Sequence, residues 1–503
     1  MIDSNIVSEE GRVPAEPEDD ALRTSRPASS RTEARNWRTV DIDLVSTEEV
    51  LRLLNAEEAT VAGAVAPVLP VLATVVDQVV ERLRAGGRVH YFGAGTSGRM
   101  GAADSAEVIP TFGLEPGIFV AHQAGGDYAL GHAVEDAEDD EALGAKDARG
   151  VSAADVAVGI TASGRTPYVA GALRSARQAG ALTVLVSSNP AAPLAALAHH
   201  GVLVDTGPEA IAGSTRLKAA TAQKMVLTAL STAAMVRLGR TYSNLMAGMS
   251  GRNAKLRRRQ LSILKEASGE QDDACRAELA RCGGDLRLAL LCLLSGLEPG
   301  AAADALAIAV EDAEDDEALG VRDARSVSAA DVVVGITASG RTPYVAGALR
   351  SARSAGALTV LVSSNPAAPL ARLADRGVLV DTGPEAIAGS TRLKAATAQK
   401  MVLNALSTAA MVRLGRTYSN LMASVSGSNA KLRQRQLVIL QEASGTRDDE
   451  LCRAELARCG GDLRLALLCL LSGLEPKVAA DALADAGGSV RGALSRLSTA
   501  WRP

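Results

Sequence analysis

Two short loops combine glycine with hydroxyl side chains in a pattern that suits anion binding. Gly93–Arg99 reads GAGTSGR and Thr161–Thr166 reads TASGRT, and each stands between a short apolar run and a helical pattern. Glycines let the backbone approach an anion, hydroxyls donate hydrogen bonds, and the N-terminus of the following helix favours negative charge. Small residues also serve simply to make tight turns, but two hydroxyl-rich loops favour a phosphate group on a small molecule. Neither loop is a Walker A sequence or a complete dinucleotide-binding fingerprint.

Two glutamates are the candidates for acid–base chemistry. Glu107 follows the first loop in the mostly apolar segment ADSAEVIPTFG, a setting that raises the pKa of a carboxyl group. Glu138 lies in the acidic run AVEDAEDDEALG, which taken alone is typical of a solvated helix face. The five histidines have no metal-ligand spacing, and the sequence has no G-x-S-x-G elbow or Cys–His signature. We therefore expect carboxylates to do the acid–base work, with no metal and no cofactor.

The elements that must position these residues follow an α/β pattern. After Arg88, short β-branched runs such as VHYF, VAVGI, LTVLV and VLVD each lead into a loop and then a helix. Continuous apolar strands that alternate with helices predict a parallel sheet covered on both faces. Ligands of such sheets bind beyond the carboxyl ends of the strands, which is where both loops are expected.

Helical patterns precede and follow the predicted sheet. Ser46 and Glu49 have capping-box spacing, which starts a helix over 46–58. Further helix is expected over 61–83, broken near Pro67 and Pro70, and over 251–307 and 427–500.

A long stretch of the chain occurs twice. AVEDAEDDEALG at 133–144 recurs at 309–320, an offset of 176 residues, and the match runs without a gap to Asp273 and Asp449. Over these 141 positions 17 differ, and CRAELARCGGDLRLALLCLLSGLEP then follows in both places. The repeat is too long for the 20–50-residue units of solenoids. We refer to residues 133–299 as the first copy and to residues 309–476 as the second copy; residues 1–132 occur once.

Composition limits the class of protein. The net charge is −5 and only 11 of 503 residues are aromatic, which argues against nucleic-acid binding. Residues 1–30 are rich in Pro, Ser and charge, so we expect a disordered tail rather than a signal peptide. The six cysteines (275, 282, 292, 452, 459 and 469) form no C-x-x-C pair, which favours free thiols in a reducing compartment. We expect a cytoplasmic protein that binds neither membranes nor nucleic acid.

Five segments resemble N-acetylmuramic acid 6-phosphate etherases, in the order that this family has them. They are TEARNWRTVDIDLVSTEEVLRLLNAEE (32–58), GAGTSGRMGAADSAEVIPTFG (93–113), AVEDAEDDEALG (133–144), GITASGRTPYV (159–169) and GPEAIAGSTRLKAATAQKMVL (207–227). The resemblance covers about residues 32–300 and returns over 309–500. It implies a sugar isomerase (SIS) fold, a homodimer, a sugar-phosphate substrate and a lyase that removes D-lactate from N-acetylmuramic acid 6-phosphate.

The resemblance also assigns roles to residues. Glu107 matches the proton donor of the family, and Glu138 matches its second catalytic carboxylate, the base at C2 of the sugar. Hydroxyls that hold the sugar phosphate are implied at Ser97, Thr161, Ser163 and Thr166, and further pocket residues at Glu209, Ser214 and Lys218. The sequence departs from the family at Val108-Ile109, where a Cys-Pro pair is usual, but it keeps the carboxylate of Glu107.

The second copy is incomplete. It carries Glu314, Thr337, Ser339 and Thr342, equivalent to Glu138, Thr161, Ser163 and Thr166, but has no counterpart of Gly93–Arg99 or of Glu107. We therefore expect it not to catalyse alone. The predicted organisation is a tail (1–30), a SIS etherase domain (31–250), a helical subdomain (251–307), a partial SIS half (308–426) and a second helical subdomain (427–503).

Two alternatives to a working etherase follow from the same residues. Two SIS-like halves in one chain resemble glucokinase regulatory protein, which senses sugar phosphates without catalysis. The second alternative is an enzyme that the duplication has inactivated, or a chain produced by faulty gene assembly. The near-identity of the copies and the presence of both candidate carboxylates favour the etherase. Residues 1–132 are expected to join the first copy because it is adjacent, although pairing with the second copy costs little extra loop entropy.

Overall fold

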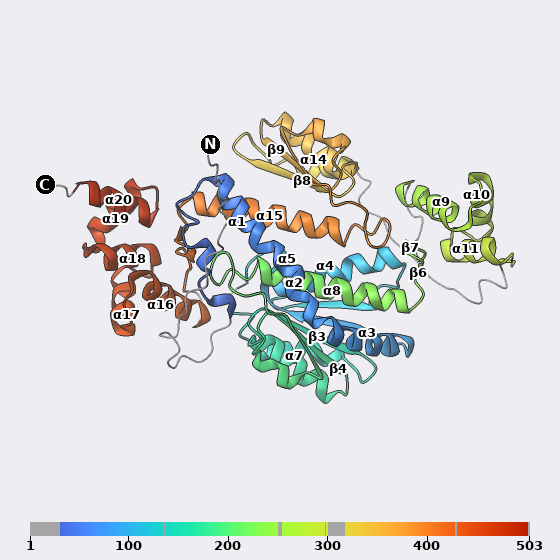
Figure 1. Ribbon diagram of the computed structural model, residues 1–503, viewed down its shortest axis with the longest axis horizontal. Coiled ribbons are helices and arrows are strands. Elements are labelled where there is room, and N and C mark those ends of the chain that lie inside the picture. The colour runs from blue at the N-terminus through green and yellow to red at the C-terminus, as the bar shows by residue number, and fades with distance from the viewer. Residues whose placement is uncertain are drawn as a thin grey trace, which may run out of the picture.

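The computed structural model describes residues 31–134, 136–249, 254–296, 298–299, 317–427 and 430–500 (Figure 1). The predicted tail over 1–30 and Glu314 of the second copy lie outside the described residues.

The main sheet is built from the unique N-terminal segment and the first copy. Its five described strands are parallel and lie in the order β2-β1-β3-β4-β5. They are β1 (Val89–Gly93), β2 (Phe119–Gln123), β3 (Val156–Thr161), β4 (Leu182–Ser187) and β5 (His200–Leu203). Every residue of β1, β3 and β4 is buried, as expected for a parallel sheet covered on both faces. The predicted α/β fold is confirmed, and β1 pairs with β3 of the adjacent copy.

Helices cover both faces of this sheet. One face packs on α3 (Leu69–Arg84), α4 (Gly95–Phe112) and α8 (Lys218–Arg237) in one hydrophobic core. The other face packs on α7 (Pro167–Gln178), which contacts α6 (Glu141–Asp147). The remaining elements of this unit are α1 (Thr47–Ala59), α2 (Val61–Val65), α5 (Tyr128–Gly131) and the hairpin β6 (Thr241–Tyr242) with β7 (Leu245–Met246).

The N-terminal helices begin and break where their residues predict. Ser46 Oγ accepts a hydrogen bond from Glu49 N at 3.2 Å and caps α1. A 3₁₀ turn over Ala66–Val68 contains Pro67 and separates α2 from α3, which has Pro70 in its first turn. The stretch Thr47–Arg84 is long and apolar enough, by length and composition, to cross a membrane. Within it, Val75 and Val79 of α3 are fully buried in the core that covers one face of the sheet.

The second copy forms a smaller sheet of its own in the described residues. The strands β8 (Val332–Thr337), β9 (Leu358–Ser363) and β10 (Arg376–Leu379) are parallel in the order β10-β9-β8, with α13 (Glu317–Asp323) and α14 (Pro343–Ser354) on one face. The other side carries α15 (Lys394–Arg413) and is followed by β11 (Thr417–Tyr418) and β12 (Leu421–Met422). The described residues contain no counterpart of α3, β1 and α4 beside β8, and Val332 and Ile336 are 58% and 41% exposed, whereas their equivalents Val156 and Ile160 are fully buried.

Each copy ends in a bundle of short helices, and Figure 1 shows the two bundles at opposite ends of the molecule. The first contains α9 (Ala254–Ser268), α10 (Asp272–Arg281) and α11 (Leu286–Ser295). The second contains α16 (Ala430–Ser444), α17 (Asp449–Arg458), α18 (Leu463–Ser472), α19 (Pro476–Asp485) and α20 (Val490–Ala500). The helical character predicted for both segments is confirmed in their described residues.

The two equivalent isoleucines give a test of this arrangement. Ile160→Ala should destabilise the main sheet by about 2–5 kcal/mol, because it opens a cavity against α4. Ile336→Ala should cost about 0.5 kcal/mol or less, because the side chain is already open to solvent. Hydrogen–deuterium exchange of the β1 peptide, whose sequence occurs once in the chain, measures both effects. Equal effects of the two variants would mean that β1 does not prefer the first copy.

Candidate functional site

The two glycine–hydroxyl loops lie at the same edge of the main sheet. β1 and β3 are parallel neighbours with Gly93 opposite Ile160, so the loops that follow them leave the sheet side by side. The first turn is tight: Gly95 has a φ of +53°, and a Cβ on Gly98 would lie 2.2 Å from Gln123 Oε1 and 2.5 Å from Gly93 O. Only glycine fits there. Ser97 lies in the first turn of α4, where backbone N–H groups point out of the helix end and attract an anion.

The second loop holds its hydroxyls in a hydrogen-bonded cluster. Thr161 Oγ1 lies 2.8 Å from Thr166 Oγ1 and 3.5 Å from Ser163 Oγ, and it accepts a hydrogen bond from Gly164 N. The second copy repeats this geometry, with 2.8 Å between Thr337 Oγ1 and Thr342 Oγ1 and with Ser339 Oγ bound to Arg341 N. The loop conformation is therefore intrinsic to its sequence, since it forms with or without β1 beside it.

Glu107 lies about three turns along the helix that begins at the first loop. Its carboxyl group is half-buried, and burial raises its pKa, although Lys224 of α8 and Arg392 of the second copy oppose the rise. A raised pKa keeps more of the carboxyl protonated near neutral pH, which suits a proton donor. The neighbouring Val108, at the position of the sequence departure, is fully buried in the core.

Glu138 lies beside the hydroxyl loop rather than on a free helix face. It is half-buried, and its backbone carbonyl accepts a hydrogen bond of 3.1 Å from Tyr168 N in the first turn of α7. Two other members of the acidic run stabilise the local structure. Asp140 caps α6 by accepting a hydrogen bond from Leu143 N, and Glu141 forms an ion pair with Arg174. The run is therefore not one solvated helix face: Asp140 and Glu141 hold α6, and the backbone of Glu138 is bonded to the start of α7, directly after the hydroxyl loop.

Glu209, Ser214 and Lys218 cluster at the start of α8. Both carboxylate oxygens of Glu209 accept hydrogen bonds of 2.9 Å from the backbone N–H groups of Lys218 and Ala219, and burial raises the Glu209 pKa to about 7. Ser214 is half-buried, and its N–H donates to Ile211 O. These contacts hold the segment together, and a sugar-binding role for it stays a prediction.

Lys218 is fixed by a partner that the sequence does not indicate. Its Nζ lies 2.7 Å from Glu57 Oε2 of α1, and both side chains are at most 4% exposed. Burial acts to raise the pKa of Glu57, but hydrogen bonds from Arg38 and Lys218 outweigh it and lower that pKa. A small cavity of about 110 Å³ lies beside this pair, between α1 and α15. This cavity is lined by neither the two loops nor Glu107.

The residues that surround Glu107 were missed by the sequence analysis. Asp104 lies one turn earlier on α4, Lys224 comes from α8, and Arg392 comes from the second copy. The i, i+3 spacing of Asp104 and Glu107 was a usable signal. Arg392, 288 residues from Asp104, has none, because only the fold brings it there.

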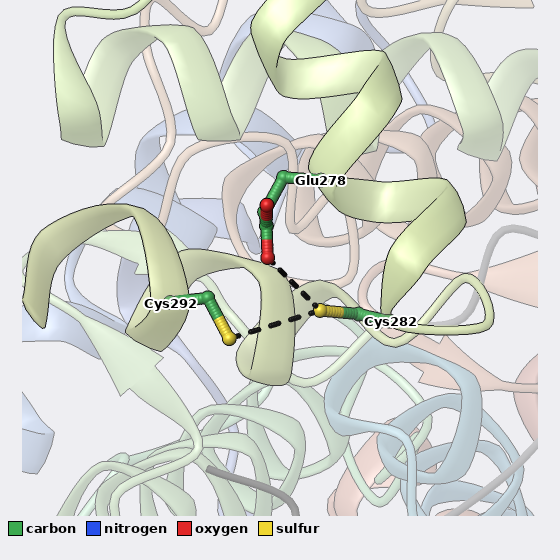
Figure 2. A group of neighbouring side chains, drawn as sticks. All are labelled: Glu278, Cys282 and Cys292. Carbon is green, nitrogen blue, oxygen red and sulfur yellow. Dashed lines mark hydrogen bonds between the residues drawn. The ribbon is translucent and has the colours of Figure 1, made fainter. Parts of the chain in front are cut away.

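Three buried side chains of the first helical bundle form a separate cluster (Figure 2). Cys282 Sγ lies 3.6 Å from Glu278 Oε1 and 3.9 Å from Cys292 Sγ, and Glu455, Cys459 and Cys469 repeat the arrangement in the second bundle. Burial raises the pKa of the Cys282 thiol to about 12, and the neighbouring thiol and carboxylate add to the rise. Contacts of protonated thiols with one another and with a carboxylate account for this cluster as a packing feature.

The ion pair of Lys218 can be tested with its own equivalent in the second copy. Lys218→Met should destabilise the protein by about 1.5–3 kcal/mol, the cost of one hydrogen bond to a buried charged group, since Arg38 still holds Glu57. Lys394→Met is the matched control, because Lys394 is exposed. Amide exchange of the unique α1 peptide reports both. A loss in the Lys394 variant as large as in the Lys218 variant would contradict this assignment.

Comparisons with known proteins place the chain in a family. The glucokinase regulatory protein N-terminal SIS domain model matches residues 71–177, and the SIS domain model matches residues 130–233 and 309–409. The etherase of Thermobifida fusca is 59% identical over 264 residues, which are 52% of this chain and 87% of that protein. Those of Rubrobacter xylanophilus and Streptomyces avermitilis are 48% and 46% identical, over 55% and 54% of this chain and 92% and 88% of theirs. All three are named N-acetylmuramic acid 6-phosphate etherase, and this chain belongs to that family.

Proposed function

We propose that the protein is a lyase that cleaves the D-lactyl ether of N-acetylmuramic acid 6-phosphate, with N-acetylglucosamine 6-phosphate and D-lactate as products. The names of the relatives support this activity. Within the molecule the observation that carries it is Glu107, a half-buried carboxyl group with a raised pKa on the helix that starts at an anion-binding loop.

The two loops supply the anchor for the phosphate group. Backbone N–H groups at the start of α4 and α7 face the same edge of the sheet, and Ser97, Ser163 and Thr166 add hydroxyls. An anion held by two helix N-termini fixes one end of an extended sugar, so the other end reaches along α4. Fixing the substrate in this way lowers the entropic cost of the reaction.

The reaction needs one base and one acid. Ring opening gives an aldehyde at C1, which acidifies the proton at C2, and we assign its removal to the Glu138 carboxylate. The electron pair forms a double bond between C2 and C3 while the C3–O bond breaks, and Glu107 gives its proton to the leaving lactate oxygen. Water then adds across the double bond, with its hydroxyl on C3 and a proton on C2. Each positioned acid or base contributes about 10²–10⁴-fold to the rate.

We place this activity in the cytoplasm, in the recycling of cell-wall amino sugars. Six cysteines, all buried and unpaired as disulfides, support a reducing compartment. The resemblance implies a homodimer. A partner subunit would have to bind a face of the molecule that the second copy does not cover.

Glu107→Gln should abolish turnover while substrate binding survives. The amide cannot donate its proton and leave an anion behind, so D-lactate release should fall by about 10²–10⁴-fold. An enzymatic D-lactate assay on the purified chain measures the rate, and calorimetry with N-acetylglucosamine 6-phosphate measures binding. Glu115→Gln, an exposed carboxyl just beyond α4, is the control and should keep full activity. Undiminished lactate release from Glu107→Gln would remove Glu107 as the proton donor.

Glu138→Gln and Glu314→Gln test which copy supplies the base. In the described part of the chain β1, α4 and Glu107 lie beside the hydroxyl loop of the first copy, so we expect Glu138→Gln alone to lose about 10²-fold or more in rate. The two variants make the same change in the same acidic run, and the same lactate assay compares them. Loss of activity with Glu314→Gln alone would assign the base to the second copy.

A further inference from the structure

The two copies contact each other through the same residues with their roles exchanged. Ala212 N donates to Asn420 O at 2.8 Å, and Ala388 N donates to Asn244 O at 2.7 Å. Adding 176 to Ala212 and Asn244 gives Ala388 and Asn420, so the second contact is the first with the copies swapped. The short bridges Ala212–Leu421 and Leu245–Ala388 repeat the exchange.

The charged side chains at this contact obey the same rule. Arg216 binds Asn404, Ser407 and Thr408 of α15, and Arg392 binds Thr228 O, Ser231 and Thr232 of α8. Lys224 Nζ donates to Arg392 O at 2.7 Å, and Lys400 Nζ donates to Arg216 O at 3.4 Å. Contacts of this kind define an isologous interface, the type that relates two subunits by a twofold axis. Here both halves belong to one chain, with α8 and α15 in contact between the two sheets (Figure 1).

The symmetry does not extend to the N-terminal segment, which occurs once and to which α4 belongs. Arg392 reaches beyond α8 to Asp104 of α4, with 3.3 Å between Nη1 and Oδ1, and both side chains are 3% exposed. On the opposite side of the interface Arg216 contacts α15. The described part of the second copy has no helix equivalent to α4 beside α15, and α1 packs there instead. One of the two equivalent arginines therefore enters the neighbourhood of Glu107, and the other does not.

We propose that the second copy completes the catalytic site of the first, with Arg392 as a positioning residue that holds Asp104 and Lys224 in place beside Glu107. Arg392 binds Asp104 through its guanidinium group and Lys224 through its backbone carbonyl, so it ties α4 to α8 through two residues whose charges act on Glu107. The inference rests on the proposed function, since it concerns the same site. It gives the otherwise incomplete second copy a task that needs no chemistry of its own.

The charges around Glu107 make the effect measurable as a pH profile. Asp104 faces it from α4, Lys224 from α8 and Arg392 from the second copy, while Glu385 of the second copy faces Lys224. The proton donor must be protonated, so activity is lost as pH rises through the pKa of Glu107. The positive charge of Arg392 lowers the pKa of Glu107. Without that charge the pKa of Glu107 should rise, so the basic limb of the pH–rate profile should move to higher pH.

The matched pair Arg392→Gln and Arg216→Gln provides the test in the full-length chain. Both variants lose the same kind of interface hydrogen bonds. Arg392→Gln should lower kcat for D-lactate release at least tenfold with KM within about threefold of the unaltered protein, and shift the basic limb upward. Arg216→Gln should leave kcat within about twofold and the limb unmoved. Equal losses in the two variants would overturn the proposal and leave Arg392 as an interface residue only.

A double variant covers the case in which Arg392→Gln fails to fold, because that change leaves the Asp104 charge buried without its partner. Asp104→Asn combined with Arg392→Gln removes both charges and should recover the thermal unfolding midpoint without recovering kcat. Recovery of kcat in the double variant would show that Arg392 only neutralises Asp104, and would overturn a positioning role. Absence of lactate release from the unaltered chain would refute the proposed function instead, so the two failures are distinguishable.

Discussion

The edge of a parallel sheet can accept one neighbouring strand, and this chain offers one β1 to two strands of nearly the same sequence. β3 reads VAVGIT and β8 reads VVVGIT, and β1 is hydrogen-bonded to β3. That pairing brings α4 with it, and α4 carries both the first anion loop and Glu107. The location of the proposed site, the burial of the main sheet and the open face of the smaller sheet all depend on it.

The two copies show how far environment outweighs sequence. Ile160 and Ile336 occupy equivalent positions in equivalent strands, yet one is fully buried and the other is 41% exposed. Lys218 is sealed against Glu57, whereas Lys394 is exposed. In each pair the backbone is alike and the difference lies in the presence of the N-terminal segment. The local conformation of a loop or helix is set by its own residues, but the contribution of a side chain to stability depends on the residues that pack against it.

This contrast also explains which features could be predicted from the sequence. The alternation of apolar runs and helices predicted the parallel sheet, and β1 and β3 placed both loops at one edge, because local patterns fix strands and turns. The capping of α1 by Ser46 and the break at Pro67 were predictable for the same reason. The pairs Glu57–Lys218 and Asp104–Arg392 were not, since 161 and 288 residues separate the partners and no local pattern marks them.

The order of synthesis on the ribosome favours the pairing of β1 with β3 over its pairing with β8. Domains fold from the N-terminus as the chain emerges, at about 5–20 residues per second. The 176 residues that separate the two strands therefore take about 9–35 s to synthesise, far longer than loop closure or collapse requires. β3 thus meets β1 before β8 exists. A circularly permuted gene that delivers the second copy first would remove that head start, and the two near-identical strands would then compete for β1 on stability alone.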